Sequence, residues 1–498
     1  MTYIKVNLWG MEIGRLVWVS ASRRTYFMFN PALKGRIPEI APLLAPAAKR
    51  NILLPIYGDD RPVYQGLPPF IADSLPDFWG NTLFDKWVKD NHIPRSRITP
   101  LYKLIFIGTR GMGALEYEPC DAQLSHNRAI DIKSLYDISL RILEDRGNLA
   151  LSSHEELTMQ ALLAVGTSAG GRQMKAILAI NNETGEIRSG QSDRLDGYDY
   201  YILKFGDKSM PMAEIETAYY NMAVAAGIGM EACRLMPVDG INHFLTKRFD
   251  RKEGKKIHVQ TLAAMNPDAT TYEELVATCR ELSISESEIE QLFVRMVFNV
   301  MANNTDDHNK NFSFLLEENG RWQIAPAYDI TFIFNTNGTG PNTARRLSVG
   351  GKTSDISKSD LLDFAKQNGI RNANAIINRV AEAIGQFNKY ADLCGITQPW
   401  RAIIQKTLND NLTAFGYLDT DESSKPTFED RYGRTVSDFS ISVNSQCHYK
   451  VTATINGQLH RRFVRPGKAI YHHLANLNIY NPSVEDKLEL VETLFPPE

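Results

Sequence analysis

Three polar side chains in one short region have the types and spacing needed for phosphoryl transfer. Asp306 is followed five residues later by Asn311, and a second aspartate, Asp329, follows a predicted hairpin. An aspartate can orient an attacking hydroxyl and accept its proton, while an asparagine and a second aspartate can hold the Mg²⁺ that neutralises nucleotide phosphates. A polar turn capped by aspartate has the same spacing, so the assignment depends on the rest of the chain.

The elements around this region are expected to bring the three side chains together. Apolar residues over 292–301 recur at helical spacing, which predicts an amphipathic helix that ends at the polar region. Strands are expected at 312–316 and 321–325, joined by an Asn-Gly turn. Because a hairpin brings its two ends together, Asn311 should lie near Asp329.

A glycine-rich segment lies upstream, at 166–171 (GTSAGG). Its small residues leave backbone N–H groups available to an anion, and Lys175 adds positive charge, so Gly170 and Gly171 are candidates for contact with nucleotide phosphates. A flexible turn is the alternative interpretation. The segment also matches the G-x-S-x-G motif of α/β-hydrolases around Ser168, but that motif needs a strand before the serine and a helix after it. The expected order here is the reverse, which disfavours a hydrolase.

Two further segments carry residues that a nucleotide site would use. Lys204 ends an apolar strand and Glu216 lies on the next helix, an arrangement in which a lysine paired to a glutamate reaches nucleotide phosphates. Phe249 could form one wall of an adenine pocket, with the backbone from Lys247 to Phe249 hydrogen-bonding the base. Taken singly, a strand-end lysine is usually solvated and a charged turn is usually exposed.

Composition limits the class of protein. The 498 residues are 43% hydrophobic and 23% charged, which is ordinary for a globular protein long enough to form several domains. The net charge of −3 gives no overall basic field for nucleic acid or anionic membrane, although a local patch is compatible with it. Five widely spaced cysteines and the absence of a signal peptide or a long apolar run predict a cytoplasmic protein.

The chain resembles the HipA family of serine/threonine kinases, the toxins of bacterial toxin–antitoxin modules. The resemblance covers residues 3–413 and depends on motifs that occur in the order of the family. These motifs are GLPPFIADSLPDFWGNTLF, SAGGRQMKA, YYILKF, LTKRFDR, NNTDDHNKNFSFL, IAPAYDIT and LSVGGK.

The resemblance implies a role for each candidate residue. Asp306 would be the catalytic base, Asn311 and Asp329 would bind Mg²⁺, Lys204 would contact ATP phosphates, and Ser168 would be the autophosphorylated residue that switches the enzyme off. Thr167 remains an alternative modification site. The implied cofactors are ATP and Mg²⁺, and the implied substrate is a protein, for which glutamyl-tRNA synthetase is the family's best-known example. A HipB-like helix-turn-helix antitoxin is the implied partner, with DNA contacted only through that partner.

The predicted fold is α+β, with a bilobal kinase-like core. We expect a HipA N-terminal subdomain at 1–118, an ATP-binding lobe at 150–255, a helical lobe with the catalytic and metal residues at 256–415, and an α+β extension of unknown role at 420–498. The cleft between the lobes would hold the site.

The sequence departs from the family pattern in two places. Lys247 stands where members often have glutamate, and Asp307 replaces a common glycine. The competing hypothesis is a catalytically silent kinase fold that only holds a DNA-binding partner. The retained Asp306, Asn311 and Asp329 argue against it.

Overall fold

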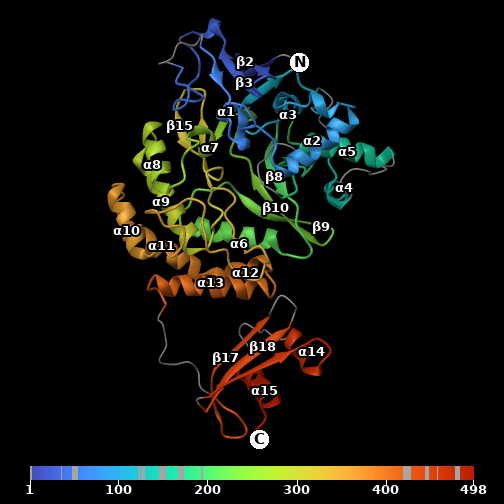
Figure 1. The fold of residues 1–498 in the computed structure, drawn as a ribbon. Helices are drawn as coiled ribbons and strands as arrows, with labels where there is room; N and C mark the ends of the chain where they lie inside the picture. The colour runs from blue at the N-terminus through green and yellow to red at the C-terminus, as the bar shows by residue number, and fades with distance from the viewer. Residues whose placement is uncertain are drawn as a thin grey trace. The chain divides into compact units, whose positions relative to one another are not determined.

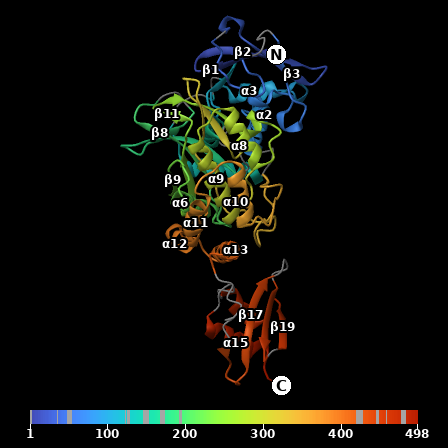
Figure 2. The same ribbon diagram turned by 90° about the vertical axis from the view of Figure 1, so that its left-hand side faces the viewer.

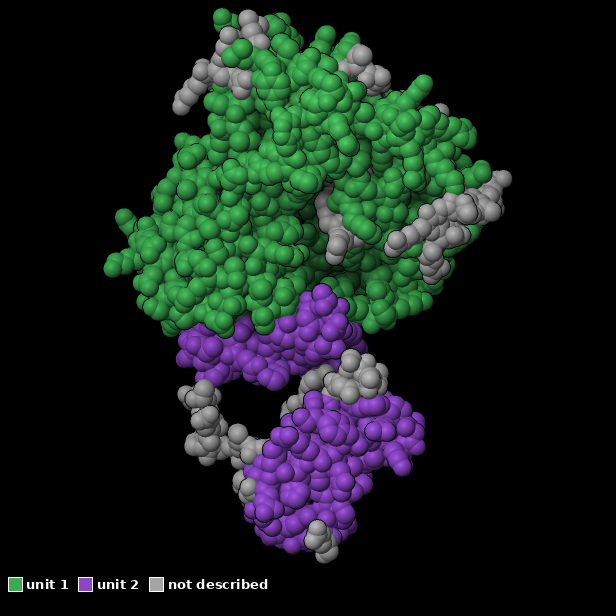
Figure 3. Space-filling view, viewed as in Figure 1, with its two compact units in different colours: residues 1–333, 342–394 green, residues 334–341, 395–498 purple. Residues whose placement is uncertain are grey.

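The structure is a computed structural model. It describes residues 3–34, 36–47, 54–121, 124, 129–144, 153–166, 173–191, 195–418, 428–443, 448–456, 458–476 and 483–497. The chain divides into two compact units, one formed by residues 1–333 and 342–394 and the other by residues 334–341 and 395–498 (Figure 3).

The first unit begins with an antiparallel sheet in the order β4-β3-β2-β1-β5. Alternate residues of its strands are buried, as expected for a sheet with one face on a core. Helix α2 begins at its N-cap Asp77, whose carboxylate accepts a hydrogen bond from the Gly80 N–H. The elements are β1 (Tyr3–Leu8), β2 (Met11–Val19), β3 (Arg24–Phe29), β4 (Ile56–Tyr57), α1 (Pro69–Ala72), α2 (Phe78–Asp90), α3 (Pro100–Ile107) and β5 (Leu115–Glu118).

A second antiparallel sheet follows, in the order β7-β6-β8-β10-β9. Helix α6 packs against β9 and β10 (Figure 1). Strand β9 is an edge strand, which suits Pro237 because an edge position needs no N–H from it. The elements are α4 (Ile132–Glu144), α5 (Ser153–Val165), β6 (Lys175–Asn181), β7 (Ile187–Ser189), β8 (Tyr198–Lys204), α6 (Met212–Ala225), β9 (Cys233–Val238) and β10 (Ile241–Lys247).

The predicted hairpin is present as two strands of a three-stranded sheet, β13-β14-β15. Helix α9 begins with a capping box at Ser285 and carries a largely buried face through Met301. The elements are β11 (Arg251–Lys252), β12 (Lys255–Lys256), β13 (His258–Thr261), α7 (Leu262–Met265), α8 (Tyr272–Glu281), α9 (Glu286–Met301), β14 (Ser313–Leu316), β15 (Trp322–Ile324), α10 (Lys358–Gln367), α11 (Ala373–Gly385) and α12 (Phe387–Cys394).

The second unit contains α13 and a four-stranded antiparallel sheet in the order β16-β17-β18-β19. Two helices after the sheet pack on one of its faces (Figures 1 and 2). The elements are α13 (Trp400–Ala414), β16 (Phe428–Glu429), β17 (Thr435–Val443), β18 (Tyr449–Ile455), β19 (Gln458–Val464), α14 (Ala469–Asn476) and α15 (Val484–Leu494).

The fold is therefore mixed α and β, as the sequence predicts. The division into units does not separate two lobes within the first unit, so the bilobal arrangement and the four predicted segments stay predictions. Within the described part of the chain, every helix is too short or too polar to cross a bilayer.

Candidate active site

The chain leaves α9 through a left-handed residue, Asn303, at φ +57°. Asparagine tolerates this conformation better than most residues, and its Nδ2 donates to the Ile333 carbonyl at 3.2 Å. The Ala302 carbonyl accepts a hydrogen bond of 2.7 Å from the Tyr219 hydroxyl on α6. These contacts fix the point from which the polar loop with Asp306 starts.

Asp306 keeps its carboxylate accessible while its backbone is held by the loop. The side chain is 46% exposed, and the Arg346 Nε lies 3.6 Å from Oδ1. The carbonyl of Asp306 accepts hydrogen bonds of 2.9 Å from both the Asn311 Nδ2 and the His308 N–H. An exposed carboxylate on a fixed backbone is suited to receive a proton from an incoming hydroxyl.

Asp307, the next residue, is buried and accepts hydrogen bonds from residues that are distant from it in the sequence. Its Oδ2 accepts hydrogen bonds from the Tyr272 hydroxyl at 2.6 Å and from Arg345 Nη1 at 2.7 Å. Its Oδ1 accepts from the Arg346 N–H at 3.0 Å. The side chains of Asp307 and Arg345 are 0% and 4% exposed, so the carboxylate compensates a buried guanidinium.

We expect Asp307→Ala to destabilise the protein by about 3–5 kcal/mol, because it leaves the Arg345 charge and the Tyr272 hydroxyl buried without their acceptor. Urea unfolding followed by tryptophan fluorescence measures this change. The control is Asp90→Ala, which removes only an exposed ion pair with Lys86 and should cost about 0.5 kcal/mol or less. Equal shifts in the two variants would contradict a structural role for Asp307.

Asp329 is delivered by the segment after β15. The Ala327 N–H donates to the Gly229 carbonyl at 2.8 Å, and the Tyr328 hydroxyl donates to the Lys310 carbonyl at 2.7 Å. Asp329 itself is left-handed at φ +52°. Asn311 and Asp329 both line one small cavity of about 10 Å³, room for about one water molecule. The structure thus brings the two predicted metal ligands to the same place.

Lys204 links Asp329 to Glu216. Its Nζ lies 2.6 Å from Glu216 Oε1, forms a short ion pair with Asp329 Oδ1, and lies 5.5 Å from the centre of the Phe244 ring. Its side chain is only 12% exposed. Although burial disfavours its charge, Asp329 and Glu216 raise the pKa of Lys204 above its ordinary value. Burial also opposes the charge of Asp329, but Lys204 and Lys175 lower the pKa of that carboxyl.

Lys175 is buried on β6, directly opposite Lys204 in the register of β6 and β8. Burial lowers the pKa of the Lys175 ammonium, an effect that Asp77 and Asp329 oppose. The Asp77 Oδ2 lies 3.5 Å from Lys175 Nζ. The predicted phosphate contact of Lys175 therefore lies within the same charged cluster as Lys204 and Asp329.

Helix α2 contacts both ends of the predicted phosphate loop. The Trp79 Nε1 donates to the Lys175 carbonyl at 3.1 Å, after the loop. Before the loop, a Cβ placed on Gly166 would lie 2.3 Å from Leu83 Cδ1, so a larger residue there would require the Leu83 side chain to move. The central residues, Ser168, Gly170 and Gly171, lie outside the described residues.

The residues expected beside adenine lie at the end of β10. Lys247 forms an ion pair of 2.9 Å with Asp199, and its N–H donates to the Ala232 carbonyl. The Arg248 N–H donates to the Tyr200 carbonyl, so neither of these N–H groups is available to a base. The ring of Phe249 lies 5.7 Å from that of Tyr328, next to Asp329. The adenine contact remains a prediction that depends on the other backbone groups of this turn.

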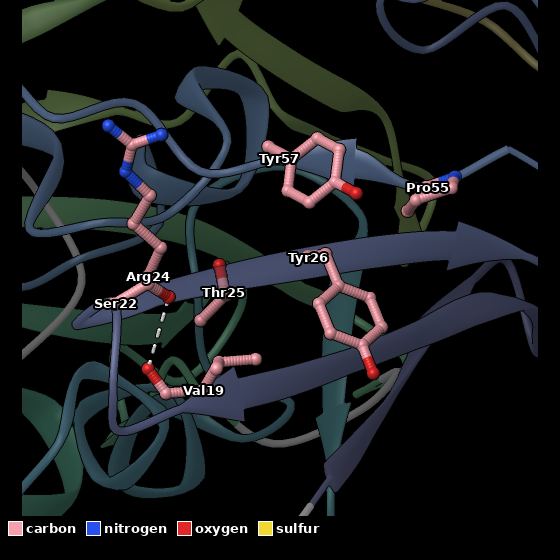
Figure 4. Close-up of a pocket in the computed structure, with 7 residues that line it drawn as sticks. All are labelled: Val19, Ser22, Arg24, Thr25, Tyr26, Pro55 and Tyr57. Atoms are coloured by element: carbon pink, nitrogen blue, oxygen red, sulfur yellow. Dashed lines mark hydrogen bonds between the residues drawn. The ribbon is translucent and has the colours of Figure 1, made fainter.

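A larger hollow, of about 380 Å³, occurs between β2, β3 and β4 and contains none of the predicted site residues (Figure 4). Its charged lining residue, Arg24, forms an ion pair with Asp60. Tyr26 and Tyr57 also line it, with ring centres 6.4 Å apart. We assign no chemistry to it.

The cavity residues fit a magnesium ion. Asn311 donates through Nδ2 to the Asp306 carbonyl, which leaves its Oδ1 as the atom that can bind a cation, and Asp329 offers a carboxylate. Among the described residues, no group of three or more His, Cys, Asp or Glu could hold a metal by itself. Mg²⁺ does not need such a group, because it commonly binds one or two protein oxygens together with water and substrate phosphates.

Comparison with known proteins places this site in a family. A model of the HipA N-terminal domain matches residues 4–118, and a model of the HipA-like C-terminal domain matches residues 167–387. The chain belongs to the HipA family. All described candidate residues from Lys175 to Asp329 lie within the second match, whereas Asp77 and Trp79 lie within the first.

Two relatives and one solved structure are also similar to this chain. A protein of Haemophilus influenzae, named as a candidate kinase, is 26% identical over 55% of this chain and 89% of its own length. A second candidate kinase, Y4mE of Sinorhizobium fredii, is 23% identical over 44% of this chain and 56% of its own length. The HipA of Shewanella oneidensis, solved with HipB and operator DNA, has a similar fold, with a TM-score of 0.57 at 13% identity over 83% of this chain and 97% of that one.

Two residues on which the site depends, Asp77 and Asp307, have contacts that the sequence does not reveal. Asp307 stands out in the sequence only as a departure from a glycine, because its partners Tyr272 and Arg345 lie far away along the chain. Asp77 is the N-cap of α2, and nothing in the nearby sequence indicates that its second oxygen faces Lys175. The signal for Asp77 is its place within the GLPPFIADSLPDFWGNTLF motif.

Proposed function

We propose that the protein is an ATP- and Mg²⁺-dependent serine/threonine kinase of HipA type. The observation that carries the proposal is the cluster in which Lys204 contacts Glu216 and Asp329 while Asp329 shares a cavity with Asn311. Phosphoryl transfer needs positioning and charge neutralisation more than covalent catalysis, and this cluster supplies cationic and anionic groups for both. The family and the names of its relatives support the same activity.

The proposed reaction assigns one task to each group. Lys204 and Lys175 hold the ATP phosphates, and Glu216 keeps the Lys204 ammonium in place. Mg²⁺, when bound by Asn311 and Asp329, would neutralise the phosphate oxygens. The substrate hydroxyl oxygen forms a bond to the γ-phosphorus while the bond from that phosphorus to the bridging oxygen of ADP breaks, and Asp306 accepts the hydroxyl proton.

We propose that Ser168 is the autophosphorylated residue and that its phosphate inactivates the enzyme. A phosphoserine would bring up to two negative charges into a loop meant to hold ATP phosphates, so the two would repel each other. Helix α2 lies close to Gly166 before this loop and donates a hydrogen bond from Trp79 to the Lys175 carbonyl after it. The protein substrate is proposed to be an aminoacyl-tRNA synthetase.

The test is mass spectrometry of the purified chain after incubation with ATP and Mg²⁺. We expect a gain of one phosphoryl group located at Ser168, and no gain at this position in Ser168→Ala. A phosphate on Thr167 instead would still support the proposed kinase activity, but the modified residue would then be Thr167. Binding of ATP without any phosphoryl gain on the chain or on added synthetase would favour the catalytically silent binding module.

We further propose a HipB-like helix-turn-helix partner and the role of toxin in a type II toxin–antitoxin module. The Shewanella HipA with a similar fold was solved with HipB and operator DNA, which supports a partner of that kind here. Duplex DNA would then be contacted through the partner. Co-purification of the chain with the product of a neighbouring helix-turn-helix gene tests the assignment.

A further inference from the structure

The segment that contains β18, β19 and α14 differs from the rest of the chain in charge. From Phe439 to Val484 the sequence contains five lysine or arginine residues and no aspartate or glutamate. The whole chain, by contrast, has 58 acidic and 55 basic residues. The small net charge of the whole chain therefore conceals this basic segment. The register of the strands determines on which face of the sheet each basic side chain lies.

The register of β18 and β19 assigns each residue to a face. Val451, Ala453, Ile455 and Val464 are buried and pack with Leu490 and other residues of α14 and α15. The other face of the same strands therefore points away from the helices. It carries, in cross-strand pairs, Lys450 opposite Phe463, Thr452 opposite Arg461, and Thr454 opposite Leu459. We call these six residues the outer face.

Apolar and basic groups alternate on the outer face. Phe463 and Leu459 are 65% and 56% exposed, a large exposure for an aromatic and an aliphatic side chain. The structure gives Lys450 and Arg461 no ion pair within the described residues, whereas Arg431 and Arg434 of the same domain pair with Glu492 and Asp430. The Ser440 hydroxyl on β17 extends the polar row and lies 2.5 Å from the Thr452 hydroxyl.

We propose that the outer face binds single-stranded nucleic acid. Unpaired cations on a flat surface suit the phosphodiester backbone, and an exposed aromatic ring between them suits a stacked base. Hydroxyl groups at neighbouring positions can hydrogen-bond the sugar or base edges. A duplex would use the cations but would leave Phe463 and Leu459 without a partner, because its bases are already stacked.

Strand addition by a second protein fits this surface less well. Strand β19 is an edge strand, but Arg461 and Arg462 are both exposed along it, and charged residues on an edge oppose pairing with another strand. An anionic membrane shares the attraction to cations, so vesicles form one arm of the test. The proposal goes beyond the kinase function and does not depend on it.

The experiment measures fluorescence anisotropy of a labelled oligonucleotide of about 12 nucleotides, added to the full chain without ATP. One arm uses single-stranded RNA, one uses DNA of the same sequence, and one uses the duplex. We expect either single strand to bind more tightly than the duplex. Affinity should fall between about 50 and about 200 mM salt, as expected for released counterions. Tighter binding of the RNA than of the DNA with the same sequence would show that the 2′-hydroxyl contributes to binding.

Two variants test the face itself. Phe463→Ala should lower the affinity roughly 5- to 150-fold, because it removes the ring on which a base stacks. The double variant Lys450→Ala/Arg461→Ala should reduce the slope of log affinity against log salt by about 0.7 for each phosphate that is no longer neutralised. The matched controls are Leu393→Ala, another exposed apolar residue, and Lys406→Ala/Arg431→Ala, an equal change in charge elsewhere. Circular dichroism verifies that all variants fold.

Any of the following results would overturn the proposal. They are no binding by the unaltered chain at low salt, equal reductions in affinity in the test and control variants, preference for the duplex, and binding to vesicles of anionic phospholipid without binding to oligonucleotide. Unchanged affinity in Phe463→Ala would show that no base stacks on Phe463, and this result would also overturn the proposal. Because ATP is absent throughout, failure of the kinase assignment would leave these results unaffected.

Discussion

Replacing Asp306 by asparagine should reduce phosphoryl transfer roughly 10²- to 10⁴-fold, the usual contribution of a positioned acid or base. The substitution keeps the shape of the side chain and removes the group that accepts the hydroxyl proton. Phosphorylation at Ser168, measured by mass spectrometry over time, reports the rate. ATP binding, measured by calorimetry, should change little because Asp306 is not among the groups that hold the phosphates.

The control for this variant is Asp410→Asn, which makes the same chemical change at an exposed residue of α13 that pairs with Lys406. It should leave the rate unchanged. Folding should be unaffected in both variants, because the carboxylate of Asp306 is 46% exposed and the backbone carbonyl of Asp306 forms the bonds that hold the loop. Undiminished phosphorylation by Asp306→Asn would remove Asp306 from the role of base.

Local patterns are sufficient to predict many of the elements that position the site. The helix before Asp306 and the hairpin after Asn311 both occur where helical periodicity and the Asn-Gly turn predict them. These elements depend on contacts between residues close in the sequence, which composition and spacing report directly. The proximity of Asn311 to Asp329 follows from hairpin geometry alone.

Contacts between distant segments cannot be predicted in this way. The hairpin is joined by a third strand, β13, whose partner β14 lies about fifty residues further along the chain. Strand β9 escapes prediction because Pro237 disfavours a strand except at an edge, and only the assembled sheet shows that β9 is the edge. Asp307 likewise owes its burial to Tyr272 and Arg345, neither of which is near it in sequence.

The two carboxylates that share Lys204 allow the metal role to be separated from the lysine-positioning role. Asp329 and Glu216 both contact the Lys204 ammonium, but only Asp329 shares the cavity with Asn311. Asp329→Asn and Glu216→Gln therefore make the same isosteric change on opposite sides of one lysine. Each leaves Lys204 with one carboxylate.

Asp329→Asn should lower the rate of phosphorylation at least about 100-fold and raise the Mg²⁺ concentration needed for half-maximal rate, because a neutral amide is a weaker ligand for a hard cation than a carboxylate. Glu216→Gln should lower the rate as well, through a less well held Lys204, without raising that Mg²⁺ concentration. The measurement is initial rate against Mg²⁺ at fixed ATP for both variants and the unaltered chain. If both variants raised the Mg²⁺ concentration for half-maximal rate equally, Asp329 would act only through Lys204. Asp329 would then not be a magnesium ligand.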